Sequence, residues 1–379
     1  MNKEQHKPIR VLHVHGDLVA GGGQTLSREW LRASDRSVID PYVVVLSEPT
    51  TLQESFEKAG IPVTRIFGSR LMQIFKLAKF IRANGIDVVH TQSEPDRKIG
   101  HWASLITRRP VIAHLHSEWV YFAKPSEEEK LIKRIRANAA FLIRRISEKS
   151  VVQLVATSDL VKDAFSNFTE KPIITVEPGV AVSLLTSDQR EKYREALKVV
   201  DDELVIVNLS RLDAVKNLED FILAVSKLSK EVKVRAFIAG EGPLREKLSN
   251  LISEKGLYRE VELLRALDDP IELLGAADIF LATSTYESFG ISVLEALSAG
   301  IPVVAYDLDV YGRYDGAVSC VEVGNVEGLV AECLRFANSP SEIESRRKLA
   351  SQAAEKYSIN VGTQALVEID QMYASKNKN

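Results

Sequence analysis

Glu287-Ser288-Phe289-Gly290-Ile291-Ser292-Val293-Leu294-Glu295 stands shortly after a short apolar run, Ile279–Ala282, which has the pattern of a buried strand. Gly290 stands where a helix is expected to begin, and most of the residues after it are apolar. Strand, loop and helix in this order form the repeating unit of a parallel α/β sheet. The stretch therefore predicts an α/β fold, with polar side chains at the carboxyl end of a strand.

The same alternation runs through the first half of the chain, as is typical of a doubly wound parallel sheet. The strands that we predict there are Ile9–Val14, Tyr42–Leu46, Val63–Ile66, Ile86–Thr91, Val111–Leu115, Val152–Ala156 and Ile173–Val176. The helices that we predict between them are Gln24–Arg32, Gln73–Ala83, Lys98–Thr107, Glu127–Glu148 and Leu160–Phe165.

The pattern then restarts after a polar segment that carries one short helix, Asp188–Lys198. The predicted strands of the second half are Leu204–Leu209, Val234–Ala239, Val261–Leu264, Ile279–Ala282 and Val303–Ala305. Its predicted helices are Leu218–Leu228, Leu244–Glu254, Ile271–Leu274, Ile291–Ser298, Val326–Ala337 and Val361–Ala374. We expect the domain boundary near 177–182, with one domain over 1–178 and a second over 179–355.

Composition limits the classes of protein that fit. A chain of 379 residues has room for two or three domains. Its 49 basic and 52 acidic residues give a net charge of -3, which argues against a nucleic-acid binder. With only two cysteines, Cys320 and Cys333, and no signal peptide or long apolar run, we expect a cytoplasmic protein.

Glu295 is an acidic residue within an otherwise apolar helix, and such a carboxylate needs a partner if it is buried. Helical side chains tilt toward the helix N-terminus, so Glu295 leans toward the loop that carries Glu287. Two carboxylates beside the free N–H groups of a helix N-terminus suit a sugar, a ribose and a diphosphate. A buried ion pair with an arginine or a lysine is the alternative explanation for Glu295.

Two cations, Arg211 and Lys216, follow the predicted strand Leu204–Leu209 and precede Asn217, the expected N-cap of the next helix. Cations at that end of a helix oppose its dipole, at a cost of about 0.3–1 kcal/mol each. A bound diphosphate would turn this cost into a gain. The alternative is that Arg211 and Lys216 are two solvated surface charges.

A glycine-rich loop, Gly21-Gly22-Gly23, follows the first predicted strand. Glycines let a backbone approach a phosphate closely, and a flexible turn is the alternative explanation for this loop.

Taken together, these segments resemble the retaining glycosyltransferases of family four, which have the GT-B fold. The resemblance covers nearly the whole chain. The residues that carry it are Ser210-Arg211-Leu212, Lys216-Asn217, Ile238-Ala239-Gly240-Glu241-Gly242-Pro243-Leu244, Ala277-Asp278-Ile279, Glu287-Ser288-Phe289-Gly290, Glu295-Ala296 and Gly300-Ile301-Pro302-Val303-Val304. The fold so implied has two Rossmann-like domains that face a cleft, and a C-terminal helix, within 356–379, that crosses back to the first domain.

The resemblance also implies residue roles. Arg211 and Lys216 would hold the donor diphosphate, Glu287 the sugar hydroxyls, and His116 would face the transferred sugar; these four form the expected catalytic set. The further residues expected to bind the donor are Gly22, Gly23, Gly240, the backbone of Phe289, Gly290 and Ile291, and Glu295 at the ribose. Candidates for the acceptor side, from the loop after Ile86–Thr91, are His90, Glu94, Arg97 and Lys98.

The implied reaction moves a sugar from a UDP-, GDP- or ADP-sugar to an unidentified acceptor hydroxyl by front-face attack, with the leaving diphosphate taking the proton. No cofactor or metal is expected. A nucleotide-sugar epimerase and a non-catalytic partner subunit are the alternatives on the same fold.

The family's glycine pair and glutamate are missing from the loop over Tyr306–Gly316, where Asp307-x-Asp309 stands instead. A basic helix over 130–145 suggests peripheral contact with the inner face of a membrane.

Overall fold

The structure is a computed structural model of the whole chain, and it describes residues 7–19, 21–92, 94–116, 146, 148–167, 169–181, 185–200, 202–267 and 269–376, without the side chains of 94–96 and 340. The chain divides into two compact units. The first comprises Met1–Val19, Gly23–Pro178 and Ile359–Asn379, and the second comprises Gly179–Ser358 with Ala20–Gly22.

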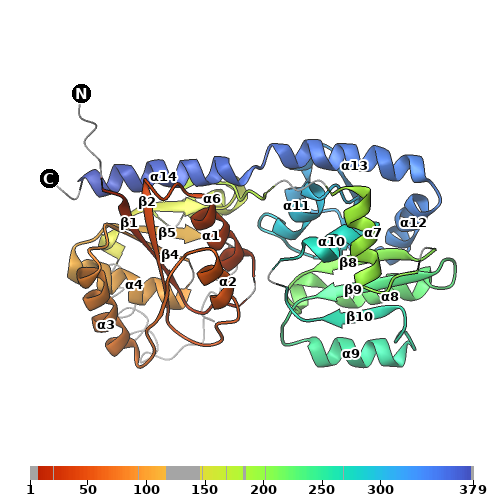
Figure 1. The fold of residues 1–379 in the computed structure, drawn as a ribbon, viewed down its shortest axis with the longest axis horizontal. Coiled ribbons are helices and arrows are strands. Elements are labelled where there is room, and N and C mark those ends of the chain that lie inside the picture. Colours follow the sequence, from red (N-terminus) through yellow and green to blue (C-terminus); the bar gives the residue numbers. More distant parts are fainter. Residues whose placement is uncertain are drawn as a thin grey trace. The chain divides into compact units, whose positions relative to one another are not determined.

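The first unit is built on a parallel sheet with the strand order β3-β2-β1-β4-β5-β6-β7 (Figure 1). Its strands are β1 (Ile9–His15), β2 (Ile39–Val45), β3 (Val63–Arg65), β4 (Val88–Thr91), β5 (Val111–Leu115), β6 (Val151–Ala156) and β7 (Ile173–Thr175). The order reverses between β1 and β4, so the crevice beside their carboxyl ends is the place where such a sheet binds ligands. β1, β4 and β5 are almost wholly buried, as the central strands of a parallel sheet with helices on both faces should be.

Helices cover both faces of this sheet. They are α1 (Gly22–Ala33), α2 (Gln53–Lys58), α3 (Arg70–Ala83), α4 (Glu94–Thr107), α6 (Asp159–Ser166) and α14 (Ile359–Lys376), with one 3-10 turn, Glu148–Ser150. Ser158 caps α6, because its hydroxyl accepts the N–H of Val161. The C-terminal helix α14 packs against β1 and β4 and so contributes to the core of the first unit (Figure 1).

The second unit has a parallel sheet with the order β10-β9-β8-β11-β12-β13. Its strands are β8 (Leu204–Leu209), β9 (Val234–Ala239), β10 (Val261–Leu264), β11 (Ile279–Ala282), β12 (Val303–Tyr306) and β13 (Val318–Val321). Its helices are α7 (Ser187–Ala196), α8 (Leu218–Leu228), α9 (Arg245–Glu254), α10 (Ile271–Ala276), α11 (Ile291–Ser298), α12 (Val326–Ala337) and α13 (Pro340–Glu355), with 3-10 helices η2 (Ala214–Lys216) and η3 (Asp309–Tyr314). Here the order reverses between β8 and β11.

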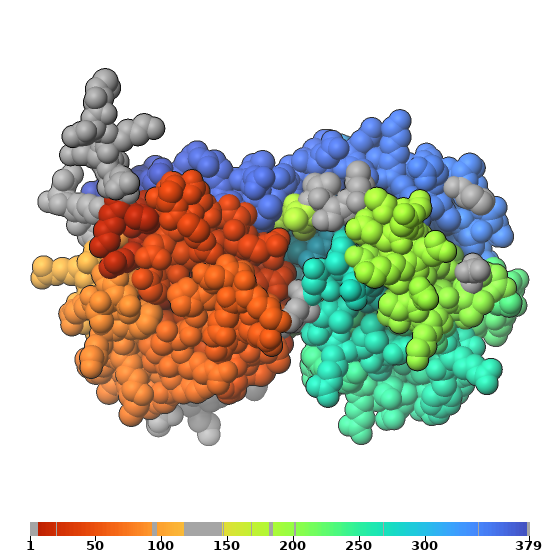
Figure 2. Space-filling view, viewed as in Figure 1, coloured from red at the N-terminus to blue at the C-terminus, as the bar shows by residue number. Residues whose placement is uncertain are grey.

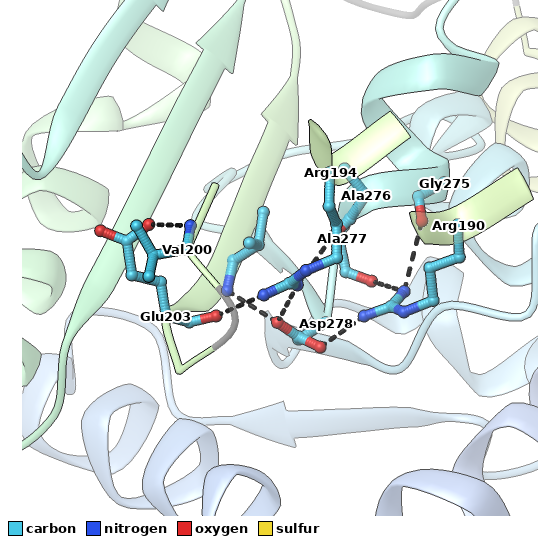
Figure 3. A network of polar contacts seen from close by, with 9 residues as sticks. Arg190, Arg194, Val200, Glu203, Gly275, Ala276, Ala277 and Asp278 are labelled. Carbon is cyan, nitrogen blue, oxygen red and sulfur yellow. Dashed lines mark hydrogen bonds and ion pairs between the residues drawn. The ribbon is translucent and has the colours of Figure 1, made fainter. Parts of the chain in front are cut away.

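Asp278, at the start of β11, joins helix α7 to this sheet (Figure 3). Its carboxylate accepts hydrogen bonds from Arg190, from Arg194 over 3.0 Å and from the backbone N–H of Val205 over 2.8 Å. Burial lowers the pKa of Arg190 to about 10 even though the nearby Asp278 carboxylate favours its charge. The acidic residue of Ala277-Asp278-Ile279 is therefore part of the scaffold of the second unit.

The sequence predicted most of these elements. β5, β8, β9, β10 and β11 and helices α8, α11 and α12 have the predicted bounds, and most other strands and helices differ by one to four residues at an end. Helices α2 and α13 and strand β13 were missed. The predicted helix over 127–148 lies almost entirely outside the described residues. Within the described ranges, every helix is too short or too polar to span a bilayer.

Candidate functional site

The loops after β8 and β11 meet at the point where the strand order of the second sheet reverses. The first loop carries Arg211 and Lys216, and the second carries Glu287. Two hydrogen bonds hold the loops together. The hydroxyl of Thr283 donates to the carbonyl of Lys216 over 3.0 Å, and the backbone N–H of Thr285 donates to the carbonyl of Val215 over 2.9 Å. This crevice is where a doubly wound sheet binds its ligand.

Lys216 and Glu287 form an ion pair in this crevice, with Nζ 2.6 Å from Oε1. Their side chains are only 17% and 12% exposed, so the pair is largely shielded from water. The hydroxyl of Ser284 donates a second bond to the same carboxylate oxygen over 2.9 Å. Two residues 71 positions apart, singled out separately in the sequence, are thus brought into direct contact.

Arg211 differs from Lys216 in its surroundings. Its side chain is 63% exposed, and its guanidinium lies 2.7 Å from the carboxylate of Asp213. An exposed pair of this kind contributes little to stability, roughly 0–1 kcal/mol. Arg211 is therefore able to exchange Asp213 for an anionic ligand at small cost.

Asn217 occupies the N-cap position of α8, as predicted, but its side chain makes no capping bond to the helix. Its backbone is left-handed, with φ 46°, and its amide donates to the carboxylate of Asp220 over 2.6 Å. The hydroxyl of Tyr306 donates to the same carboxylate over 2.5 Å. Asn217 therefore fixes the turn that follows Lys216 rather than capping α8.

Helix α11 begins at Gly290, whose φ of 82° lies in the left-handed region that favours glycine. Its first N–H groups have no carbonyl partner within the helix, which makes this end suited to an anion. Glu295 lies one turn further on, half-buried, on the same face as Ile291. This face of α11 is partly open to solvent, so the carboxylate of Glu295 is only partly buried.

Gly240 and Gly242 have a packing reason to be glycine. A Cβ atom on Gly240 would stand 1.8 Å from the carbonyl oxygen of Ser210, and one on Gly242 2.4 Å from that of Leu212. The loop after β9 therefore lies directly against the backbone beside Arg211. Gly240 shapes the loop that carries this cation.

The segment Tyr306–Gly316 forms η3 and packs beneath the start of α11. The hydroxyl of Tyr314 donates to the carbonyl of Phe289 over 3.3 Å, and the guanidinium of Arg313 stacks on the Phe289 ring at 4.5 Å. Tyr311 packs against Gly290, where a Cβ atom would meet its ring at 3.0 Å. Burial, with a smaller effect of Glu287, raises the pKa of Tyr311 well above its usual value.

In the first unit, a cluster of histidines lies at the carboxyl ends of β1, β4 and β5. Its members are His13, His15, His90, His114 and His116. Gln92, directly after β4, joins two of them: its Oε1 lies 2.8 Å from His116 Nε2 and its Nε2 lies 3.1 Å from His13 Nδ1. Gln92 was missed in the sequence, although its place directly after a strand was a usable signal.

Burial keeps several of these imidazoles neutral. It lowers the pKa of His116 to about 4, with a smaller contribution from the nearby charge of Arg97. It lowers the pKa of His15 to about 3, with a smaller contribution from His116. The pKa values of His13 and His114 are lowered well below their usual range for the same reason. His116, which is only partly buried, lies beside Gly23, where a Cβ atom would meet its ring at 3.4 Å.

Two candidates for the acceptor side have internal partners instead. His90 is fully buried, 2.7 Å from Asp370 on α14 and 2.8 Å from His114. Arg97 is also buried and donates to the carbonyl of His114 over 2.6 Å. Their side chains stabilise the core of the first unit, so we withdraw them from the acceptor set. Lys98 is exposed, and the side chain of Glu94 is outside the described part.

Two further segments are Asp307-x-Asp309 and the basic stretch 130–145. Among the described residues, no group of three or more histidine, cysteine or acidic side chains could hold a metal ion, and Asp307 and Asp309 belong to no such group. The basic segment 130–145 lies outside the described residues.

Comparison with known proteins agrees with this architecture. The family model described as "Glycosyltransferase Family 4" matches residues 20–184, and the one described as "Glycosyl transferases group 1" matches residues 189–356. The two matches meet within the polar segment between the sheets, with only residues 185–188 between them. Together they account for most of the chain.

Curated relatives are matched at low identity. The alpha-monoglucosyldiacylglycerol synthase of Streptococcus pneumoniae is 27% identical over 234 residues, which are 58% of this chain and 52% of the relative. The synthase of the same name from Acholeplasma laidlawii is 25% identical over 79% of each chain. This chain spans about half the length of the first of these relatives.

Solved structures support the fold. Anabaena Alr3699/HepE, in complex with UDP and glucose, has a TM-score of 0.78 at 19% identity, over 95% of this chain and 99% of that one. A glycosyltransferase from Rickettsia africae has a TM-score of 0.74 at 18% identity, over 97% and 99%. With two parallel Rossmann-like sheets and both family models matched, this chain belongs to glycosyltransferase family four and has the GT-B fold.

Proposed function

We propose that this chain transfers a hexose from a nucleotide-diphosphate sugar to an acceptor hydroxyl, with retention of anomeric configuration. The contact between Lys216 and Glu287 carries the proposal, since it joins a cation and a hydrogen-bond acceptor at the ligand-binding crevice of the second sheet. The donor class is supported by the structures of Anabaena Alr3699/HepE, which hold UDP with glucose or UDP-glucose. The base, the sugar and the acceptor of this chain are open within this class.

Each part of the donor has a matching group in the second unit. Arg211 and Lys216 bind the diphosphate, whose charge suits both cations and the N-terminus of α11. Glu287 accepts hydrogen bonds from the sugar hydroxyls, and the backbone of Phe289, Gly290 and Ile291 adds contacts. Glu295, one turn into α11 on its partly open face, accepts from the ribose hydroxyls.

The chemistry needs charge stabilisation more than a covalent nucleophile. The acceptor oxygen forms a bond to the anomeric carbon while the bond from that carbon to the diphosphate oxygen breaks. The proton of the acceptor passes to the departing diphosphate oxygen. Arg211 and Lys216 stabilise the negative charge that develops there, which is the larger part of catalysis in such a site.

Residues of the N-terminal half of the chain have proposed roles as well. His116 faces the transferred sugar as a neutral hydrogen-bonding group, because burial holds its pKa at about 4. Gly22 and Gly23 let the backbone approach the phosphates. Glu94 and Lys98 remain the proposed acceptor-side residues. We propose domains over 1–178 and 179–355, with residues 356–379 returning to the first.

We also propose that the reaction takes place in the cytoplasm. Cys320 and Cys333 are both free thiols, with Cys320 exposed and Cys333 buried. Free thiols suit a reducing compartment.

The test is to incubate the purified chain with UDP-, GDP- and ADP-sugars and to follow the anomeric proton of the released sugar by NMR before it mutarotates. We expect one donor to be consumed and its sugar to be released with the anomeric configuration of the donor. Release of the opposite anomer contradicts retention, and no turnover of any donor contradicts the activity.

Two variants locate the site within this experiment. Lys216→Ala should abolish most of the turnover. Lys227→Ala is the matched control, because Lys227 forms a comparable ion pair with Glu327 on the surface of the same unit, 2.8 Å apart. Equal turnover by the two variants contradicts the assignment of Lys216.

A further inference from the structure

Helix α3 of the first unit exposes large apolar side chains. Leu71 is 66% exposed, Met72 49% and Phe75 60%, and all three lie in the first two turns of the helix. Such residues are normally scattered singly over a protein surface, and a group of them marks an interaction site. Helix α3, which packs beside α4, lies at the surface of the first unit and is orange in Figures 1 and 2.

The exposed face of α3 also carries its basic residues. At about 100° per residue, Leu71, Phe75 and Arg82 fall within about 40° of each other around the helix axis. Lys76, Lys79 and Met72 continue the same exposed face. Gln73, Leu77, Ala78 and Ile81 form the opposite, buried face. We refer to Leu71, Met72, Phe75, Lys76, Lys79 and Arg82 as the α3 surface.

The charge of the α3 surface has one sign. The helix contains Arg70, Lys76, Lys79 and Arg82 and no acidic residue. Within the described ranges, none of these four is paired with a carboxylate: Lys76 donates to the carbonyl of Phe67, and Arg82 to that of Ile106. Asp87, the first acidic residue after the helix, accepts the backbone N–H of Arg10.

The neighbouring helix extends this surface. Ile106, near the end of α4, is 37% exposed and lines an open hollow of about 480 Å³ together with Phe75, Ala78, Lys79, Arg82 and Ala83. Apolar side chains and long basic side chains share this exposed face, which suits a surface that binds an anionic membrane by apolar burial and by charge together. Lysine and arginine stems can cover apolar surface while their charged ends reach the headgroups.

We propose that the α3 surface docks on an anionic lipid bilayer. Leu71, Met72 and Phe75 enter the boundary between headgroups and acyl chains, and Lys76, Lys79 and Arg82 contact the lipid phosphates. The inference uses only contacts within the first unit and does not depend on the proposed activity.

A second copy of this chain fits the α3 surface less well. A two-fold interface places the same patch on both subunits, so the lysines of one copy would face those of the other. Like charges brought together in this way repel. An anionic bilayer has the opposite charge over its whole area and needs no complementary shape.

The test is co-sedimentation of the full chain with vesicles of phosphatidylglycerol and, separately, of phosphatidylcholine. We expect binding to the first at least tenfold tighter than to the second, and weaker binding as salt is added, because each basic residue near an anionic surface contributes about fivefold. Equal binding to both lipids, or binding to neither, overturns the proposal.

Two pairs of variants, each checked by its melting temperature, assign the binding to this surface. The double variant Lys76→Glu/Lys79→Glu should bind the vesicles at least tenfold more weakly than the wild-type chain. The control, Lys192→Glu/Lys255→Glu, replaces two exposed lysines of the second unit, changes the net charge by the same amount and should lose little affinity. Phe75→Ser should weaken binding, and Val200→Ser, at the same 60% exposure, should not. Equal losses within either pair overturn the proposal.

A dye attached to the α3 surface reports directly whether this surface enters the bilayer, even if one of the charge or Phe75 variants folds poorly. In a Cys320→Ser background, an environment-sensitive dye at Met72→Cys should shift to shorter wavelength with phosphatidylglycerol vesicles, and the dye at Val200→Cys should not. Light scattering gives the mass in solution. A stable dimer that Phe75→Ser dissociates would instead assign the surface to a second copy.

Discussion

The proposed donor site depends on two residues, Lys216 and Glu287. In the proposed site, a bound diphosphate would compete with Glu287 for Lys216, and the carboxylate released from Lys216 would gain capacity to accept hydrogen bonds from hydroxyl groups. The bond from Ser284 keeps the carboxylate in place during such an exchange. The ion pair therefore orients both groups before the donor binds.

Glu287→Gln tests this role at nearly constant size. An amide keeps one acceptor oxygen but loses the charge, and a hydrogen bond to a charged group is worth about 1.5–3 kcal/mol, so kcat/KM should fall about 10- to 100-fold. Steady-state kinetics with the accepted donor measures the effect. Glu327→Gln, in the surface pair with Lys227, should leave kcat/KM unchanged, and equal losses would contradict the role of Glu287.

Gln92 holds the ring of His116 in place, as Ser284 holds the carboxylate of Glu287. Its carboxamide joins His116 to His13, and losing a hydrogen bond of this kind costs about 1 kcal/mol, so Gln92→Leu should lower kcat by roughly five- to tenfold. Turnover is measured under saturating donor, with a melting curve to show that the fold is kept. A fully active, folded Gln92→Leu protein would mean that the ring of His116 needs no such support.

Among the elements, helix α11 and the segment η3 depend on one another. Gly290 starts α11 with a positive φ, and the ring of Tyr311 from η3 packs against its Cα. The glycine pair and the glutamate of the family that this chain resembles are missing from this segment. Tyr311 and Tyr314 instead form a buried support beneath the helix N-terminus.

Gly290→Ala should therefore destabilise the chain by about 1–3 kcal/mol, the range for a residue held in a strained backbone conformation. Chemical denaturation measures the loss, and donor binding should weaken with it. Gly312→Ala is the control within the same segment, since a Cβ atom there meets nothing within 4 Å. Equal stability of the two variants would contradict the importance of this turn.

Local sequence patterns were sufficient for the strands that are apolar on both faces and for the glycine that begins α11. They failed for α13, whose sequence Pro340–Glu355 is largely polar, and for β13, an edge strand whose apolar run is interrupted by Ser319. They also gave no sign of the contact between His90 and Asp370, 280 positions apart. Contacts of this kind depend on the order of strands in the sheet, which periodicity does not specify.

At the scale of the whole molecule, the histidine cluster makes stability depend on pH. His15 is neutral in the folded chain down to a pH of about 3 but takes a proton in the unfolded chain below about pH 6.5. The unfolded state then binds more protons, so the free energy of unfolding falls as the pH falls from about 6.5, by about 1.4 kcal/mol per pH unit for each such histidine. His13, His114 and His116 add effects of the same sign.

His15→Gln should make this dependence less steep. Urea unfolding of the wild-type chain between pH 7.5 and about pH 5 should show falling stability below pH 6.5, and the variant should lose about 1.4 kcal/mol less per pH unit. An unchanged slope in the variant, or stability that rises as the pH falls, would contradict the neutral state of the buried imidazoles.

The proposed function requires a nucleoside diphosphate to bind beside Lys216 and Glu287. Titration calorimetry with UDP, GDP and ADP, on the wild-type chain and on Lys216→Ala, Arg211→Ala and Glu295→Ala, tests this most directly. We predict that one nucleotide binds and that each variant weakens it by about tenfold or more, while Lys227→Ala does not. Failure of all three nucleotides to bind at millimolar concentration, or wild-type affinity in Lys216→Ala, would contradict it.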